Sequence, residues 1–170
     1  MAAILDTAGL STRAFYRHFA SKDELFLAML KRDSDAVARR LRRVAQETPG
    51  GPADQLTAWV DYLLGLAYNP RRRAHAVVLD SDEVRVAKGY REASAELRAD
   101  RERILADILR QGRDDGSFPL AEPDRDAAAI HALVDRAFAA PLLGVGPDRE
   151  RLVGYVVDFA LRALGAKPAR

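Results

Sequence analysis

The sequence has 170 residues, of which 48% are apolar and 31% are charged, a composition typical of a folded globular protein. It contains no cysteine, which excludes disulfide scaffolds, cysteine-ligated zinc and thiol nucleophiles. No apolar run approaches the roughly 20 residues of a transmembrane helix, and the N-terminus lacks the basic start of a signal peptide. We therefore expect a cytoplasmic protein with no membrane partner.

The net charge of +2 is unevenly distributed along the chain. Residues 1–44 carry nine Lys and Arg against five Asp and Glu, a net charge of +4, whereas the remainder carries −2. Between Ser11 and Lys22 there are three cations and one histidine but no acid. A short basic segment on a nearly neutral body is typical of a localised contact with a polyanion.

The predicted elements are helices throughout, because helix-forming residues dominate and an alternation of period two is never sustained. A first short helix ends at Gly9, which suits a left-handed C-terminal position, and Ser11 begins a second. Ser21 and Glu24 then have the spacing of a capping box, which predicts the start of a helix running to about residue 45.

Five more helices follow in chain order, separated by turns rich in glycine and proline. They are expected over residues 53–68, 71–79, 81–112, 123–143 and 148–164. The helix over 81–112 is predicted as one long element because apolar residues keep near-helical spacing along it. The fold class is therefore predicted to be all-α.

Residues 4–30, ILDTAGLSTRAFYRHFASKDELFLAML, contain the most informative pattern. Two short helices joined by a turn that contains glycine have the layout of a helix-turn-helix. Phe15 and Phe19 are four residues apart, so they share one face of the second helix and are expected to point inward. The outward face then carries hydroxyls and cations, as a recognition helix in the major groove of DNA requires. These outward residues are Thr12, Arg13, Tyr16, Arg17 and His18.

The stretch AGLSTRAFYRHFASKDEL resembles the helix-turn-helix of the TetR family of one-component transcriptional regulators. Nine positions match the pattern of that family in register: Ile4, Ala8, Gly9, Ser11, Phe15, Tyr16, Phe19, Lys22 and Leu25. The resemblance implies that Arg13 and Arg17 face base edges. It also implies contacts to phosphates or sugars from Ser11, Thr12, Tyr16, His18 and Lys22.

The resemblance further implies an N-terminal helix-turn-helix followed by a helical domain that binds a ligand and dimerises. Residues 1–45 are then the DNA-binding domain with its connecting helix, and residues 46–170 are the ligand-binding and dimerisation domain. DNA-binding domains of the family have one more helix ahead of the position of Met1, so we expect a start codon placed too late. If the protein has instead lost that helix, the alternative function is a ligand-binding or partner-binding helical dimer that does not bind DNA.

The last two predicted helices are more apolar than a single buried stripe requires, which favours a homodimer formed through a four-helix bundle. Such a dimer places two recognition helices about one DNA turn apart on a palindromic operator of double-stranded DNA. The alternative is that both helices belong to the core of a monomer. The predicted interface residues are Ile130, Leu133, Val134, Phe138, Leu152, Val153, Val156, Val157, Ala160 and Leu164.

A small-molecule effector is expected among the middle helices, in a cavity with apolar walls and a few polar groups. We expect the chain to be a repressor that this effector releases from DNA. Each candidate residue also fits a plain role in the core. The candidates are Trp59, Tyr62, Leu66, His75, Leu79, Tyr90, Leu97 and Phe138.

An enzyme is the main rival class, and the sequence argues against it. The three histidines are isolated and form no HExxH pattern, and residues 144–146 lack the third glycine of a dinucleotide loop. Asp80, Asp82 and Glu83 could suggest a metal site. They lie at a predicted helix start, however, where acids complement the helix dipole without any metal. We therefore predict no catalytic residues, no cofactor and no metal.

Overall fold

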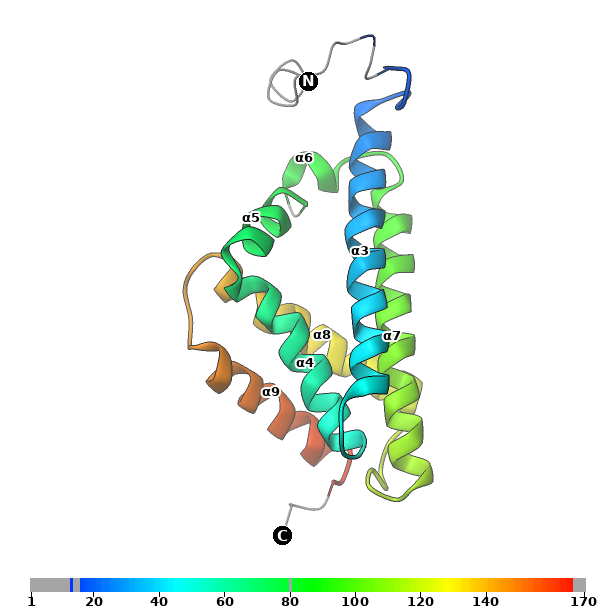
Figure 1. The fold of residues 1–170 in the computed structure, drawn as a ribbon, viewed down its shortest axis with the longest axis vertical. Helices are drawn as coiled ribbons and strands as arrows, with labels where there is room; N and C mark the ends of the chain where they lie inside the picture. Colours follow the sequence, from blue (N-terminus) through cyan, green and yellow to red (C-terminus); the bar gives the residue numbers. More distant parts are fainter. Residues whose placement is uncertain (1–12, 14–15, 80, 167–170) are drawn as a thin grey trace.

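A computed structural model describes residues 13, 16–79 and 81–166 of the chain. The described part is helical, as predicted, and contains no strand (Figure 1). Seven helices have defined bounds: α3 (Lys22–Glu47), α4 (Pro52–Tyr68), α5 (Pro70–Leu79), α6 (Asp82–Arg85), α7 (Tyr90–Asp114), α8 (Pro123–Leu142) and α9 (Arg149–Ala163).

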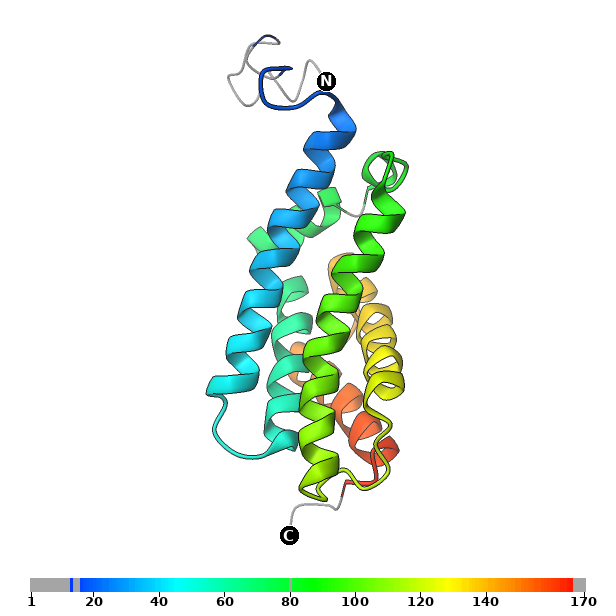
Figure 2. The ribbon, with the colours of Figure 1, turned by 90° about the vertical axis from the view of Figure 1, so that its right-hand side faces the viewer.

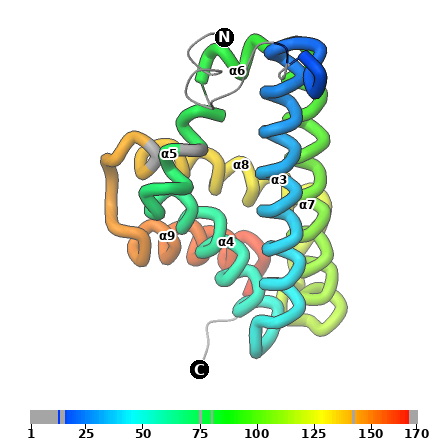
Figure 3. The backbone as a smooth tube through the Cα atoms, turned by 45° about the horizontal axis from the view of Figure 1, so that its top comes forward, coloured from blue at the N-terminus to red at the C-terminus, as the bar shows by residue number. Residues whose placement is uncertain are grey.

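The two longest helices, α3 and α7, lie side by side along the length of the molecule (Figure 2). Helix α4 runs beside the second halves of both, and α8 and α9 pack around it (Figure 1). The starts of α3 and α7 extend beyond this body, and the short helix α6 lies next to them (Figure 3). The described part of the chain therefore has a helical body at one end, with the start of α3 and α6 at the other (Figure 3).

The core of the body is built from apolar stripes on five helices, α3, α4, α7, α8 and α9. The period of 3.6 residues places these side chains on the inward face of each helix. Trp59 of α4 and Phe118, in the loop after α7, are the bulkiest and are fully buried. The stripe of α3 that joins this core consists of Val37, Ala38 and Leu41.

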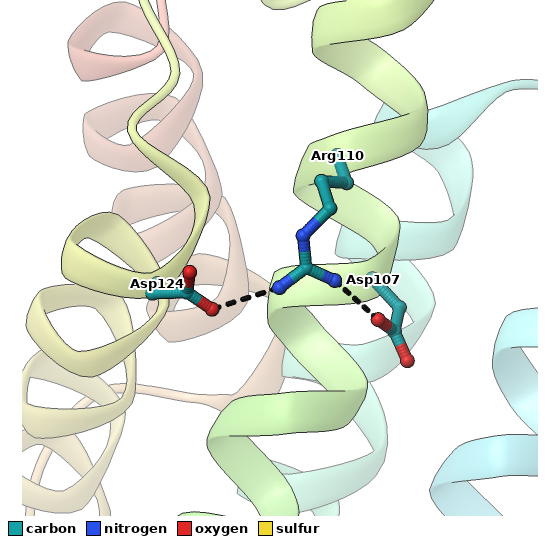
Figure 4. Close-up of polar contacts among 3 residues, drawn as sticks. All are labelled: Asp107, Arg110 and Asp124. Atoms are coloured by element: carbon teal, nitrogen blue, oxygen red, sulfur yellow. Dashed lines mark hydrogen bonds and ion pairs between the residues drawn. The ribbon is translucent and has the colours of Figure 1, made fainter.

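Polar contacts tie the ends of α7 and α8 together (Figure 4). Arg110 of α7 contacts Asp107 on its own helix and donates to Asp124 in the first turn of α8, at 2.8 Å. Nearby, the Phe118 amide donates to the carbonyl of Gly112 at 2.8 Å, which turns the chain back over the end of α7. The Phe118 ring packs directly against Gly112, at a site that has no room for a larger residue.

The prediction of one helix over residues 81–112 is wrong. Helix α6 ends at Arg85, and α7 begins only at Tyr90 after a turn that contains Gly89 at φ 87°. That left-handed conformation suits glycine and interrupts the helix. Val86, one of the apolar residues within that predicted helix, is 82% exposed, whereas its neighbours Val84 and Ala87 are buried.

Val84 and Ala87 form a second, smaller apolar cluster with Phe26 of α3, and Tyr90 packs against it. This cluster, here called the upper cluster, lies away from the core of the body. It fixes α6 and the start of α7 against the first turns of α3.

The other helices predicted from residue 22 onward agree with the structure to within two residues at each end. The first short helix of the helix-turn-helix lies outside the described residues, and the second is described only in part. The predicted boundary between domains at residue 45 falls close to the break between α3 and α4, and the division itself stays a prediction. In the described part of the chain, none of the helices combines the length and apolarity needed to cross a membrane.

Candidate functional site

The predicted recognition segment lies ahead of α3, and the structure describes part of it. Ser11 and Thr12 lie outside the described residues, as do Ile4, Ala8, Gly9 and Phe15. Arg13 and Tyr16 are helical, and Arg17 and His18 form the turn that follows. All four of these side chains are exposed, whereas Phe19 is half-buried. The described part of the segment therefore presents its cations outward, as a contact with a polyanion requires.

The start of α3 has the cap that the sequence predicts, with one difference. The Ser21 hydroxyl accepts the Glu24 amide at 3.1 Å, and the Glu24 carboxylate accepts the amide of Ala20 rather than that of Ser21. The polar cap orients the first turn of α3 with its free amides toward the N-terminal segment. Such a helix start favours a nearby anion, including a phosphate.

Lys22, the predicted phosphate contact in this first turn, has an acidic partner in the structure. Its Nζ lies 3.2 Å from the Oε2 of Glu83 on α6, and 5.0 Å from the centre of the Phe26 ring. The adjacent Asp23 carboxylate accepts the amide of Lys88 at 3.2 Å. The candidate DNA-binding end of α3 is therefore in direct contact with the segment that follows α5.

A second group of polar residues lies inside the body, where the helices would otherwise present only apolar side chains. His131 of α8 is 1% exposed. Its ring packs edge-on against Trp59, with centroids 5.9 Å apart, and its two nitrogens lie 3.4 Å from Glu102 and 3.8 Å from Asp135. Burial lowers the pKa of His131 although the neighbouring carboxylates act in the opposite direction. The ring is therefore held in its neutral form more strongly than in an unfolded chain.

Arg101 of α7 belongs to the same group. Its guanidinium donates to the Ser34 hydroxyl of α3 at 3.0 Å, while its Nε is buried without a hydrogen-bond acceptor. Burial lowers the pKa of Arg101, and Asp135 and Asp33 partly offset that effect. The indole NH of Trp59 is likewise buried without an acceptor. Both donors, on α4 and α7, lack a partner among the described residues, and an acceptor group of a ligand would satisfy them.

At the edge of this group, Tyr62 of α4 is half-buried, and desolvation raises the pKa of its hydroxyl. Arg72 of α5 is the strongest opposing charge, and it pairs with Asp33 of α3 at 3.7 Å. We call the whole set the interior polar cluster, although it extends to the surface at the exposed residues Arg72 and Asp135. It consists of Asp33, Ser34, Trp59, Tyr62, Arg72, Arg101, Glu102, His131 and Asp135.

The structure does not bring all eight predicted effector residues together. Trp59 and Tyr62 lie in the interior polar cluster, and Leu66 and Phe138 pack against the core of the body. Tyr90 instead packs on the upper cluster, and Leu97 lines a separate surface groove between α3 and α7. Leu79 is buried at the end of α5, and the side chain of His75 lies outside the described part.

The sequence reading missed Arg101, His131 and their acidic neighbours as candidates. Ser34, Arg101 and His131 occupy inward positions of amphipathic helices, which is the signal that distinguishes them from surface charges. Among the described residues, no group of three or more His, Asp or Glu side chains has the arrangement of a metal site.

The predicted dimer residues stay a prediction, and the structure places most of them in the interior of one protomer. Apolar side chains from the other helices of the same chain cover them, so they do not form its free surface. Tyr155 and Phe159 of α9 were not predicted, yet they are 61% and 56% exposed. Leu133, Phe138 and Leu152 are partly exposed. The seven buried residues are Ile130, Val134, Val153, Val156, Val157, Ala160 and Leu164.

Comparison with known proteins places these features in a family context. Residues 1–29 match the model of "Bacterial regulatory proteins, tetR family". The HTH-type transcriptional repressor KstR2 of Mycobacterium tuberculosis is 26% identical over 132 residues, which cover 77% of this chain and 63% of that protein. KstR2 of Mycolicibacterium smegmatis is 26% identical over 132 residues, covering 77% of this chain and 62% of its own length. The chain thus spans less than two thirds of these repressors.

Solved structures show the same fold. The reduced form of NemR from E. coli superposes with a TM-score of 0.78 at 22% identity, covering 99% of this chain and 88% of that one. A bacterial regulatory protein in the tetR family from Rhodococcus RHA1 superposes with a TM-score of 0.70 at 21% identity, covering 98% and 86%. The resemblance to TetR-family transcriptional regulators is therefore confirmed, by the N-terminal motif and by the all-helical fold.

Proposed function

We propose that the protein is a transcriptional repressor that binds a palindromic operator in double-stranded DNA as a homodimer and is released by a small-molecule effector. The match of residues 1–29 to the tetR-family model is the observation that carries the proposal. The exposed cations Arg13 and Arg17, directly ahead of the capped start of α3, support it. In this proposal the protein acts in the cytoplasm and is not an enzyme.

DNA recognition is assigned to the predicted recognition segment. Arg13 and Arg17 are proposed to read base edges, and Ser11, Thr12, Tyr16, His18 and Lys22 to contact the backbone. Base contacts carry sequence information, whereas phosphate contacts add affinity for any sequence. The two kinds of residue are therefore expected to respond differently to substitution.

The effector is proposed to bind beside the interior polar cluster. Tyr62, Leu66 and Phe138 would supply the partly exposed wall, and the unsatisfied donors of Trp59 and Arg101 the polar contacts. Buried donors without acceptors cost free energy, so a ligand that supplies an oxygen at this site gains affinity from them. This assignment replaces the scattered set of eight residues by those that share one region of the body.

The homodimer is proposed to form through the outer faces of α8 and α9. The exposed rings of Tyr155 and Phe159 lie one turn apart on α9, and aromatic residues are enriched at protein interfaces relative to the rest of the surface. A twofold axis through this face would bury both rings of each protomer, so each ring contributes two copies to the interface.

The DNA-binding proposal is tested with the full-length protein and a pool of random duplexes, from which an operator is selected. We expect a palindromic sequence, bound with an affinity that falls steeply as salt rises. Arg17→Ala should lower the preference for the operator over scrambled DNA, whereas Lys22→Ala should weaken both about equally. Arg43→Ala, an exposed change in the second half of α3, serves as the matched control. Equal affinity for selected and scrambled duplexes would refute sequence-specific repression and favour a dimer that binds only ligands or partners.

A further inference from the structure

The lysine assigned to a phosphate contact is already paired with a carboxylate from a distant part of the chain. Lys22 and Glu83 are 61 residues apart, yet their side chains meet at 3.2 Å. The Lys22 side chain is 33% exposed and that of Glu83 is 71% exposed, so both groups are open to an incoming polyanion. The ammonium also lies over the ring of Phe26, which restricts its position.

Glu83 is held at this place by several independent contacts. Val84, the next residue, is 1% exposed and packs against Phe26 in the upper cluster. On the far side of the turn, the Lys88 amide donates to Asp23, the residue next to Lys22. Gly89 lies close to the Leu27 side chain, at a distance where an added Cβ would be 3.2 Å from its Cδ1. Helix α6, which carries Glu83, is therefore held beside the start of α3 (Figure 3).

We propose that Glu83 is a positioning residue that lowers DNA affinity by competing with a phosphate for the ammonium of Lys22. This inference rests on the proposed DNA-binding function. A phosphate that approaches Lys22 must displace the Glu83 carboxylate or remain next to a like charge, and both reduce the gain from the contact. Because α6 belongs to the segment that follows α5, its position against α3 couples the helical body to the DNA-binding end.

The size of the effect follows from the exposure of the pair. An exposed ion pair contributes little to the free energy of the equilibrium it affects. Its loss corresponds to roughly a one- to five-fold change in the equilibrium constant. Glu83→Gln is therefore expected to raise the affinity for the operator about two- to five-fold for each protomer. The increase should shrink as salt rises, since salt screens exposed charges.

Removal of any acid near DNA raises affinity to some extent, so the experiment needs a matched charge control. Asp82→Asn removes the same charge one residue away, on the same short helix, from a side chain that is exposed. Operator binding of the full-length protein is measured by fluorescence anisotropy for the wild type, Glu83→Gln, Asp82→Asn, Lys22→Ala and the double variant Lys22→Ala with Glu83→Gln. We expect Glu83→Gln to raise operator affinity more than Asp82→Asn does. Once Lys22 is alanine, the gain from Glu83→Gln should fall to that of Asp82→Asn.

Two results would overturn the competition while leaving the DNA-binding function intact. The first is an equal gain from Glu83→Gln and Asp82→Asn, which would reduce the effect to overall charge. The second is a gain from Glu83→Gln that is as large in the Lys22→Ala background as in the wild type, because Glu83 would then act without Lys22. A wild-type protein that binds no selected operator would instead overturn the proposed function, and this inference with it.

Discussion

Replacement of Phe159 by aspartate is expected to separate the proposed dimer into folded monomers. About half of the Phe159 ring is exposed in the protomer, and Tyr155 lies beside it on α9. Burial of the exposed half of a phenylalanine is worth about 1–1.5 kcal/mol, and a twofold interface counts it twice. The resulting loss of about 2–3 kcal/mol raises the dissociation constant of the dimer about 30- to 150-fold, before any cost of desolvating the aspartate.

Sedimentation velocity over a range of protein concentrations measures this change, with thermal unfolding recorded on the same samples. The folded monomer should remain stable, because the substituted position is on the surface. Val86→Asp, at a position that is 82% exposed between α6 and α7, is the matched control and should leave the dimer intact. Val156→Asp should unfold the protein, since Val156 is 3% exposed in the protomer. An unchanged dissociation constant for Phe159→Asp would refute the assignment of the interface to this face of α9.

Two further predictions concern the stability of the body. Because burial lowers the pKa of His131 in the folded state, the unfolded state takes up the proton first, so the free energy of unfolding should fall as pH drops below about 6.5. His131→Gln should flatten this dependence on pH in urea unfolding between pH 7 and pH 5. Equal slopes for His131→Gln and for the exposed control His18→Gln would contradict this prediction. Gly112→Ala should lower the free energy of unfolding by about 1–3 kcal/mol, because a Cβ there would overlap the buried ring of Phe118. Gly154→Ala, which meets nothing within 4 Å, should not lower it, and equal effects of the two changes in thermal unfolding would exclude the overlap as the cause.

Helix positions and caps could be predicted because each depends on residues close together in the sequence. Ser21 caps α3 and Asp148 caps α9, both by accepting an amide three residues on. The long helix over 81–112 failed for a non-local reason. Val84 and Ala87 turn inward to meet Phe26 of α3, which is far away in the sequence, and a pattern of spacing carries no information about that partner.

The residues of a dimer interface are hard to predict for a related reason. The apolar stripe on α9 shows that one face of the helix is covered, but the pattern is the same whether the cover comes from α4 or from a second chain. In the structure the helix packs against α4, and Val156 and Val157 are buried there. The rings of Tyr155 and Phe159 were overlooked because they fall outside the main stripe, among charged neighbours. Exposed aromatic residues on the other face are thus the better guide to a partner.

The two long helices connect the proposed effector site with the proposed DNA contact. Helix α3 carries Lys22 in its first turn and Ser34 three turns later, and α7 carries Arg101, the hydrogen-bond partner of Ser34. A continuous helix transmits a displacement along its length with little bending, so a ligand that engages Arg101 acts on the same pair of helices that hold the upper cluster. The ion pair between Lys22 and Glu83 lies at the far end of that pair. A change in the packing of α3 against α7 would alter the distance between these two charges, and with it the strength of the competition that the Glu83 variants measure.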